Sequence, residues 1–424
     1  MSLHKDLPEL VESGVITPEI AERIRAFYAS KGGTPKNRMT IVFGIFGAIL
    51  VGLGVILIIA HNWDELTKSS KTILAFVPLI ISQCLAGYTI LKKKDSISWR
   101  ESTGVLLFFG IGASISLVSQ VYHISGDLSG YLLTWMALSL PVIYLLRSSA
   151  TSLLYLVGIT AYVISSYGGM GHEELNYYLL MLFILPYYYW LFRQSPNSYF
   201  LYFHHWFISI SLTITLASLM NVAAPLTMVG YMSLFGLFYQ VGQMDFWSKE
   251  KLWRNAYRVI GSLGTIVLLL GLSFEDFWAA LRKWSYQDVM GTAEFWVAAV
   301  LTVVTTALLV LNLKKKSILE MKPATLVYLL FPLLYLMGLW SGGAVVIVNI
   351  LLFVIGLLTI REGGRMNNLG VLNYGVLIIA ALVTCRFFDS DLSFVARGLL
   401  FVAVGIGFFA VNYWMLQKRK RHEL

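Results

Sequence analysis

The sequence predicts an all-α, polytopic integral membrane protein. Of its 424 residues, 57% are hydrophobic and only 13% are charged, and the mean hydropathy is +0.71. This composition is far more apolar than that of a soluble protein of the same length. Long apolar runs recur along the chain and are separated by short polar segments. Such runs are expected to be helices, because a helix satisfies its own backbone hydrogen bonds in lipid.

The apolar runs are long enough to cross a bilayer, which takes about 20 residues per helix. By this rule the chain holds fourteen predicted spans and divides into a cytoplasmic segment, 1–38, a transmembrane bundle, 39–416, and a basic tail, 417–424. The predicted spans cover residues 39–60, 72–91, 103–122, 129–146, 150–167, 175–192, 200–219, 223–241, 258–273, 293–313, 323–340, 343–360, 369–388 and 395–416.

The distribution of basic residues gives the bundle an orientation. If the amino terminus is cytoplasmic, most of the 32 Lys and Arg residues fall in segments on the cytoplasmic side, as the positive-inside rule requires. We therefore expect both termini in the cytoplasm. The net charge of +9 then reflects topology, and nucleic acid is not expected as a partner.

Two segments outside the spans have helical patterns. Before the first span, Gly14 ends one short helix, and Thr17 and Pro18 begin another as its N-cap and first residue, which predicts a helical hairpin. The stretch FEDFWAALRKW, 274–284, places its large apolar side chains on one face and its charges largely on the other. This amphipathic pattern predicts an interfacial helix on the outer surface.

Three polar clusters lie where predicted spans reach the outer side, in IIAHNWDEL (58–66), QVYHISGDL (120–128) and CRFFDSDLSFVARG (385–398). Polar side chains are costly at such positions unless they face the bundle interior. We therefore predict that the clusters converge on one ligand site, named here the outer-face site. Its candidate ligand-binding residues are His61, Asn62, Trp63, Asp64, Glu65, Gln120, His123, Asp127, Arg386, Asp389, Asp391 and Arg397.

Each cluster also has a structural interpretation. Trp63 is typical of a headgroup-level aromatic residue, and Gln120 is adequately explained by an interhelical hydrogen bond. The arginines of the third cluster flank two aspartates, so a structural ion pair is about as well supported as an anionic ligand site. The adjacent His204 and His205 point in different directions along a helix and are given no catalytic role. No metal site or cofactor is predicted.

Four segments resemble a known family. They are SGVITPEIAERI (13–24), VGLGVILIIAHNWDELTKSSK (51–71), QVYHISGD (120–127) and RFFDSDLSFVARG (386–398). They resemble the DUF2157 family, bacterial predicted membrane proteins of unknown function, and the resemblance extends over nearly the whole chain. The carboxy-terminal part is similar to the related DUF4401 proteins. This resemblance implies residence in the bacterial inner membrane and supplies no activity, substrate or catalytic residue.

Three hypotheses of function follow. The first is a transporter or scramblase for an anionic or amphipathic envelope molecule, in which Arg386 and Arg397 receive the anionic group. Movement would be facilitated rather than proton-driven, because no carboxylate lies in the middle of a predicted span. The second is an interfacial enzyme that uses His61, Asp64, His123 and Asp127 as acid, base or metal ligands, although the chain carries no HExxH or GxSxG motif. The third is a sensor or assembly factor that binds a cytoplasmic protein through residues 1–38.

Overall fold

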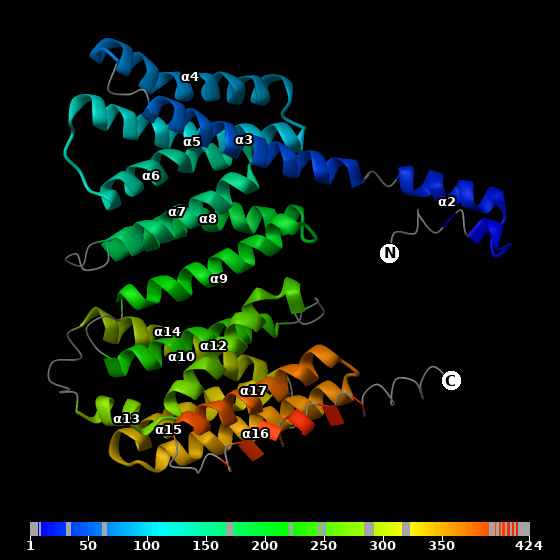
Figure 1. The fold of residues 1–424 in the computed structure, drawn as a ribbon, viewed down its shortest axis with the longest axis vertical. Coiled ribbons are helices and arrows are strands. Elements are labelled where there is room, and N and C mark those ends of the chain that lie inside the picture. Colours follow the sequence, from blue (N-terminus) through cyan, green and yellow to red (C-terminus); the bar gives the residue numbers. More distant parts are fainter. Residues whose placement is uncertain are drawn as a thin grey trace. The chain divides into compact units, whose positions relative to one another are not determined.

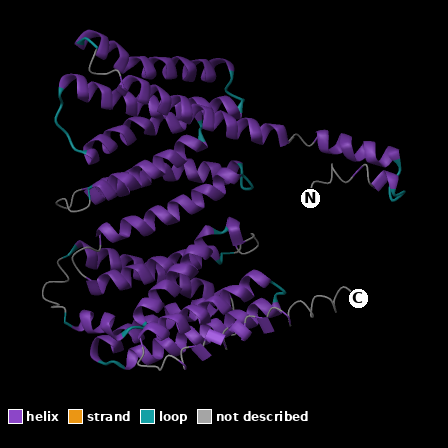
Figure 2. Cartoon of the chain, in the orientation of Figure 1, coloured by secondary structure: helices purple, strands orange, loops and turns teal. Residues whose placement is uncertain are grey.

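The computed structural model describes most of the chain, and every regular element in the described part is a helix (Figures 1 and 2). The described residues are 7, 10–30, 35–61, 66–166, 173–219, 224–244, 247, 252–283, 292–315, 323–389, 395, 398–399, 401–402, 405–407, 409–410 and 413. An all-α membrane protein is therefore confirmed. Seven of the described helices are long and apolar enough to cross a membrane, or eight if the bent pair α12–α13 counts as one span.

Each predicted span from 39–60 to 369–388 coincides with a helix. Half of the last one, 395–416, lies outside the described residues. The helices are α2 (Pro18–Ser30), α3 (Pro35–His61), α4 (Lys68–Lys92), α5 (Ile97–Tyr122), α6 (Leu128–Leu146), α7 (Ser149–Ser165), α8 (Glu173–Gln194), α9 (Tyr199–Leu219), α10 (Ala224–Gly242), η2 (Leu252–Arg254), α12 (Ala256–Leu272), α13 (Glu275–Arg282), α14 (Ala293–Lys315), α15 (Pro323–Trp340), α16 (Gly343–Arg365) and α17 (Leu369–Asp389).

The segment before α3 has the predicted turn at Gly14 and the predicted start of α2. Gly14 adopts a left-handed conformation with φ 72°, and the amide of Ile20 donates to the hydroxyl of Thr17 at 3.4 Å. Glycine reaches this φ without steric cost, and a threonine hydroxyl satisfies an amide at the start of a helix. The helix α2 therefore begins where the sequence indicates.

The chain divides into two compact units. Unit 1 comprises Met1–Ser166 and Leu175–Gln194, and unit 2 comprises Tyr167–Glu174 and Ser195–Leu424. In unit 1, α5 packs against α3, α4, α6 and α7. Close approach is possible at Gly112, where an added Cβ would lie 2.5 Å from the Trp135 ring of α6. The indole of Trp135 donates to the carbonyl oxygen of Phe108 at 2.7 Å, which ties α6 to α5.

Unit 2 is built around α10, α12, α15 and α16. The helix α10 packs against α12 and α14, and α16 packs along α17. Fully buried side chains from these helices form one core, including Leu269 of α12, Trp278 of α13 and Leu352 of α16. Backbones meet closely where α16 contacts α17, because a Cβ on Gly375 would lie 2.7 Å from the amide nitrogen of Ile360.

The helix α13 corrects one prediction. A helix forms at 275–282 as expected and bends by 79° from α12, but its apolar face is not turned toward lipid. Trp278 is fully buried, and its indole donates to the carbonyl oxygen of Leu272 at 2.7 Å. Gly338 of α15 leaves room for the Trp278 ring. The amphipathic pattern of 274–284 thus reflects packing against α15, since a protein core and a lipid surface select the same apolar stripe.

Candidate functional site

The predicted outer-face site is described only in part. His61 is the last residue of α3 and Asp389 the last of α17. The remaining residues of two clusters, Asn62, Trp63, Asp64, Glu65, Asp391 and Arg397, lie outside the described residues. Convergence of the three clusters on one ligand therefore stays a prediction.

The second cluster forms the turn between α5 and α6. His123 ends α5 in a left-handed conformation with φ 51°, and Gln120 is exposed. Asp127 is the N-cap of α6, where its carboxylate accepts from the amide of Gly130 at 3.1 Å and from the hydroxyl of Ser129 at 2.6 Å. These two hydrogen bonds lower the pKa of Asp127. The described contacts of Asp127 are thus those of a helix cap.

Arg386 of the third cluster lies beside the break between α12 and α13. Its guanidinium stacks over the Phe274 ring at 4.5 Å from the centroid and donates to the hydroxyl of Ser273 at 3.2 Å. The amide of Asn349 donates to the carbonyl oxygen of Ser273 at 3.2 Å. A helix break exposes backbone groups that need partners, and Asn349 supplies one of them.

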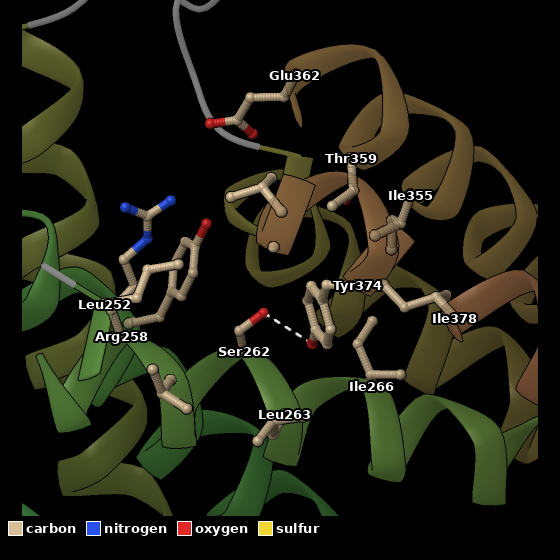
Figure 3. A pocket seen from close by; sticks show the side chains of 14 residues that line it. Leu252, Arg258, Ser262, Leu263, Ile266, Ile355, Thr359, Glu362, Tyr374 and Ile378 are labelled. Atoms are coloured by element: carbon tan, nitrogen blue, oxygen red, sulfur yellow. Dashed lines mark hydrogen bonds between the residues drawn. The ribbon is translucent and has the colours of Figure 1, made fainter. Parts of the chain in front are cut away.

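A pocket that sequence reasoning missed lies within unit 2. It is a cavity of about 200 Å³ between α10, α12, α16 and α17 (Figure 3). Arg258 and Glu362 lie toward one side, while Ile266 and Ile378 lie on the other. Between them the hydroxyls of Ser262 and Tyr374 are hydrogen-bonded at 3.0 Å. The pocket, named here the charged pocket, is therefore polar at one end and apolar beyond it.

Local structure fixes both charged residues at helix ends. Asn255 caps α12, accepting from the amide of Arg258 at 3.0 Å and donating to the carbonyl oxygen of Gly242 at 2.8 Å. This holds Arg258 in the first turn of α12, next to the end of α10. Glu362 lies in the last turn of α16, where Gly363 allows α17 to approach at Leu372. The three helix ends thus bring a cation and an anion together.

Arg258 and Glu362 do not form a direct ion pair, whereas Arg282 and Glu275 do so among the described residues. Arg258 instead lies close to the hydroxyl of Tyr239. A guanidinium offers several N–H donors in one plane and suits phosphate or carboxylate. Glu362 offers two acceptor oxygens. The charged pocket can therefore bind a group that carries an anion and a hydrogen-bond donor or cation.

A second feature that sequence reasoning missed is the buried Glu101 of unit 1, which is 2% exposed. Its carboxylate accepts from the hydroxyl of Ser148 at 2.8 Å, the amide of Ser149 at 3.0 Å and the amide of Ala150 at 2.8 Å. These donors form the amino-terminal end of α7. In the sequence, the feature that could have indicated Glu101 was an acidic residue close to the start of the predicted span 103–122.

The described residues were compared with the ligand sets that bind metal ions. In the parts of the chain that the structure describes, no three His, Cys, Asp or Glu residues are grouped so that they could hold a metal ion. His204 and His205 are both fully buried in α9, and His205 packs its ring edge-on against Trp247 at 4.3 Å between centroids.

Comparison with known proteins identifies part of the chain. Residues 8–152 match the family model described as predicted membrane protein (DUF2157). The match covers less of the chain than the resemblance predicted, and similarity of the carboxy-terminal part to DUF4401 stays a prediction. A search of curated proteins and a search of solved structures found no significant match. Residues 8–152, which include α2 to α6, are thus similar to the DUF2157 family of predicted membrane proteins, and the rest of the chain lies outside the match.

Proposed function

We propose that the protein binds an anionic or zwitterionic amphiphile of the bacterial inner membrane and lets it move between the two leaflets. The observation that carries this proposal is the charged pocket, where Arg258 and Glu362 lie beside a cavity lined by isoleucines. A lipid has the matching pattern, because its charged headgroup is attached directly to apolar chains. Arg258 would hold the anionic group, and Glu362 would hold an ammonium or hydroxyl group when the headgroup has one.

The proposal includes the topology of fourteen spans with both termini cytoplasmic. In that topology the segments before α12 and after α16 are cytoplasmic, so Arg258 and Glu362 of the charged pocket lie toward the cytoplasmic side. This side differs from that of the predicted outer-face site. The two sites are compatible, since an amphiphile that crosses the membrane needs a headgroup position at each surface.

Arg386 supports a second headgroup position. The pocket residue Tyr374 lies near the start of α17, and Arg386 lies twelve residues further along the same helix, which is roughly 18 Å at the helical rise of 1.5 Å per residue. The helix α12 also links the two positions. Arg258 of the charged pocket lies near its start, and Ser273, the partner of Arg386, lies at its end. One pair of helices thus carries a cation near each end.

Binding of a short-chain phosphatidylglycerol to the purified, delipidated full chain, followed by native mass spectrometry, tests the headgroup assignment. Arg258→Gln removes the cation and is expected to weaken binding by about tenfold, the usual order for a charge-assisted hydrogen bond. Arg361→Gln is the matched control, because Arg361 is exposed and does not line the pocket. Equal binding by wild type and Arg258→Gln would rule out this headgroup site.

A zwitterionic probe separates the role of the carboxylate. With short-chain phosphatidylethanolamine, Glu362→Gln is expected to weaken binding, because the ammonium group loses its partner. The same variant should leave phosphatidylglycerol binding nearly unchanged. An equal effect of Glu362→Gln on both lipids would show that Glu362 supports the pocket structurally and does not contact the headgroup.

A further inference from the structure

Unit 2 contains a second cavity, named here the hydroxyl cavity. It measures about 270 Å³ and lies between α10, α14 and α15. Ser233, Thr302 and Thr305 line it, together with Tyr328 and Pro332, and none of the described residues that line it is charged. These residues lie near the middle of their helices. In the proposed fourteen-span topology all three helices cross the membrane, which places the cavity deep in it.

The hydrogen-bond directions make the cavity a set of acceptors. A hydroxyl has one hydrogen to donate and two lone pairs to accept with. Thr302 donates to the carbonyl oxygen of Ala298 at 2.7 Å, and Thr305 donates to the carbonyl oxygen of Ser233 at 2.7 Å. The contact of 2.8 Å between the hydroxyls of Ser233 and Thr302 therefore has Ser233 as its donor. All three hydrogens are used, and lone pairs remain.

Pro332 adds a further acceptor. Proline has no amide hydrogen, so the carbonyl oxygen of Tyr328, four residues earlier in α15, lacks its usual helical donor. The hydroxyl of Tyr328 is not available to a ligand in the hydroxyl cavity, because it contacts the hydroxyl of Thr265 and the carbonyl oxygens of Phe235 and Gly261. A ligand at this position would therefore meet acceptors.

The cavity is lined on one side by exposed residues of α14 and α15, which face lipid in the proposed topology. Thr306, Pro332 and Leu336 line it and are exposed, with Leu336 56% exposed. A molecule can therefore enter from the hydrocarbon region. Deep in the membrane an ionised group is costly, whereas a neutral hydroxyl that finds an acceptor is not.

We propose that the hydroxyl cavity binds the hydroxyl group of a neutral lipid alcohol, with its chain lying along α14 and α15. The hydroxyl donates its single hydrogen to the remaining lone pair of Thr302, beside Ser233, and the apolar chain leaves past Leu336. This site needs no anion and no cation, and it does not depend on ligand binding in the charged pocket.

Photolabelling of the full chain in lipid vesicles tests the site with two probes, a long-chain alcohol that carries a diazirine and its methyl ether. The ether cannot donate a hydrogen bond. Labelling within 229–236, 302–306 and 328–336, read by mass spectrometry of peptides, is expected to be roughly three- to tenfold stronger for the alcohol, the range of one hydrogen bond. Equal labelling by both probes would overturn the proposal.

Variants locate the contact. Thr302→Val keeps the shape and removes the lone pairs, so the alcohol should label it no better than the ether, while Thr302→Ser should label as wild type does. The matched control is Thr213→Val on α9, whose hydroxyl makes the same bond to the fourth preceding residue, Ser209, at 2.7 Å. Wild-type labelling of Thr302→Val would contradict the site. Arg258→Gln should label as wild type does, which keeps this result separate from that of the charged pocket.

Discussion

Glu101 is a carboxylate placed against the amino-terminal end of a neighbouring helix. The first amides of a helix lack partners within the helix and lie at the positive end of its dipole. Glu101 of α5 accepts from two such amides of α7 and from the hydroxyl of the N-cap residue Ser148. A buried carboxylate is tolerated when donors satisfy it in this way, and the contact fixes α5 to α7.

Replacing Glu101 by Gln is therefore expected to destabilise the protein by about 2 kcal/mol, since a hydrogen bond to a charged group is worth about 1.5–3 kcal/mol. The side-chain NH₂ of the new glutamine is itself a donor, and it would face at least one of the three donors that now hydrogen-bond to Glu101. The measurement is the apparent Tm in detergent. Glu275→Gln is the control, because that carboxylate is 53% exposed and its ion pair with Arg282 is worth at most about 1 kcal/mol. Equal loss in both variants would contradict the capping role.

Asp127 gives a dependence on pH. Its pKa is lowered below the ordinary value of 3.8, so folding favours the ionised form. The resulting stability is present above pH 3.8 and is lost as the pH falls through the lowered pKa. The difference in apparent Tm between wild type and Asp127→Ala should accordingly shrink in acid. Asp127→Asn keeps an uncharged acceptor at the N-cap, so the difference in apparent Tm between Asp127→Asn and Asp127→Ala should not change with pH. A difference between wild type and Asp127→Ala that stays constant with pH would contradict the assignment.

At the scale of elements, the bend between α12 and α13 depends on one close contact. Trp278 of α13 lies against Gly338 of α15, where an added Cβ would overlap the indole. The ring also contacts Tyr335, with centroids 5.9 Å apart. A glycine is therefore required at this position in α15, and the packing of α13 depends on it.

The variant Gly338→Ala should lower stability by about 1–3 kcal/mol, the usual cost of overpacking a core, again read from the apparent Tm. Gly271→Ala near the end of α12 is the control, because nothing lies within 4 Å of the added Cβ. That substitution is expected to be neutral or slightly stabilising. Similar destabilisation by Gly338→Ala and Gly271→Ala would show that the loss comes from replacing a helical glycine and not from the contact with Trp278.

The sequence predicted helices better than it predicted contacts between them. A span is specified locally by about 20 apolar residues, so the helices from α3 to α17 coincide with the predictions. Contacts depend on distant partners. Glu101 accepts hydrogen bonds from residues 47 to 49 positions later, and Arg258 and Glu362 line the same pocket although they are far apart in the sequence. Neither arrangement leaves a local pattern.

The candidate site was predicted where polar residues are close in sequence. Asp127 illustrates the difficulty, because a residue that caps a helix and a residue that binds a ligand both appear as a polar group after an apolar run. Arg386 also lies beside Phe274 and Ser273, contacts with the break between α12 and α13 that the sequence did not predict. Its pairing with Asp389 and Asp391 stays a prediction.

At the scale of the whole molecule, the fourteen-span topology makes a prediction about sidedness. Cys84→Ser and Cys385→Ser first remove both native cysteines. Single cysteines are then introduced on the predicted outer side by Gly126→Cys or Ser341→Cys. On the predicted inner side they are introduced by Asp95→Cys or Met366→Cys. An impermeant maleimide added to spheroplasts should label the first two, and should label the others only after the membrane is opened. Opposite sides for Gly126 and Ser341 would show an odd number of crossings between them and contradict the topology.

The most direct test of the proposed function is movement of a fluorescent phosphatidylglycerol between the leaflets of vesicles that contain the purified full chain, followed with an impermeant quencher. Wild type should speed exchange over protein-free vesicles. Arg258→Gln should slow it by about tenfold, and the control Arg361→Gln should match wild type. Exchange that is as fast with Arg258→Gln as with wild type, or no faster with wild type than without protein, would contradict the account.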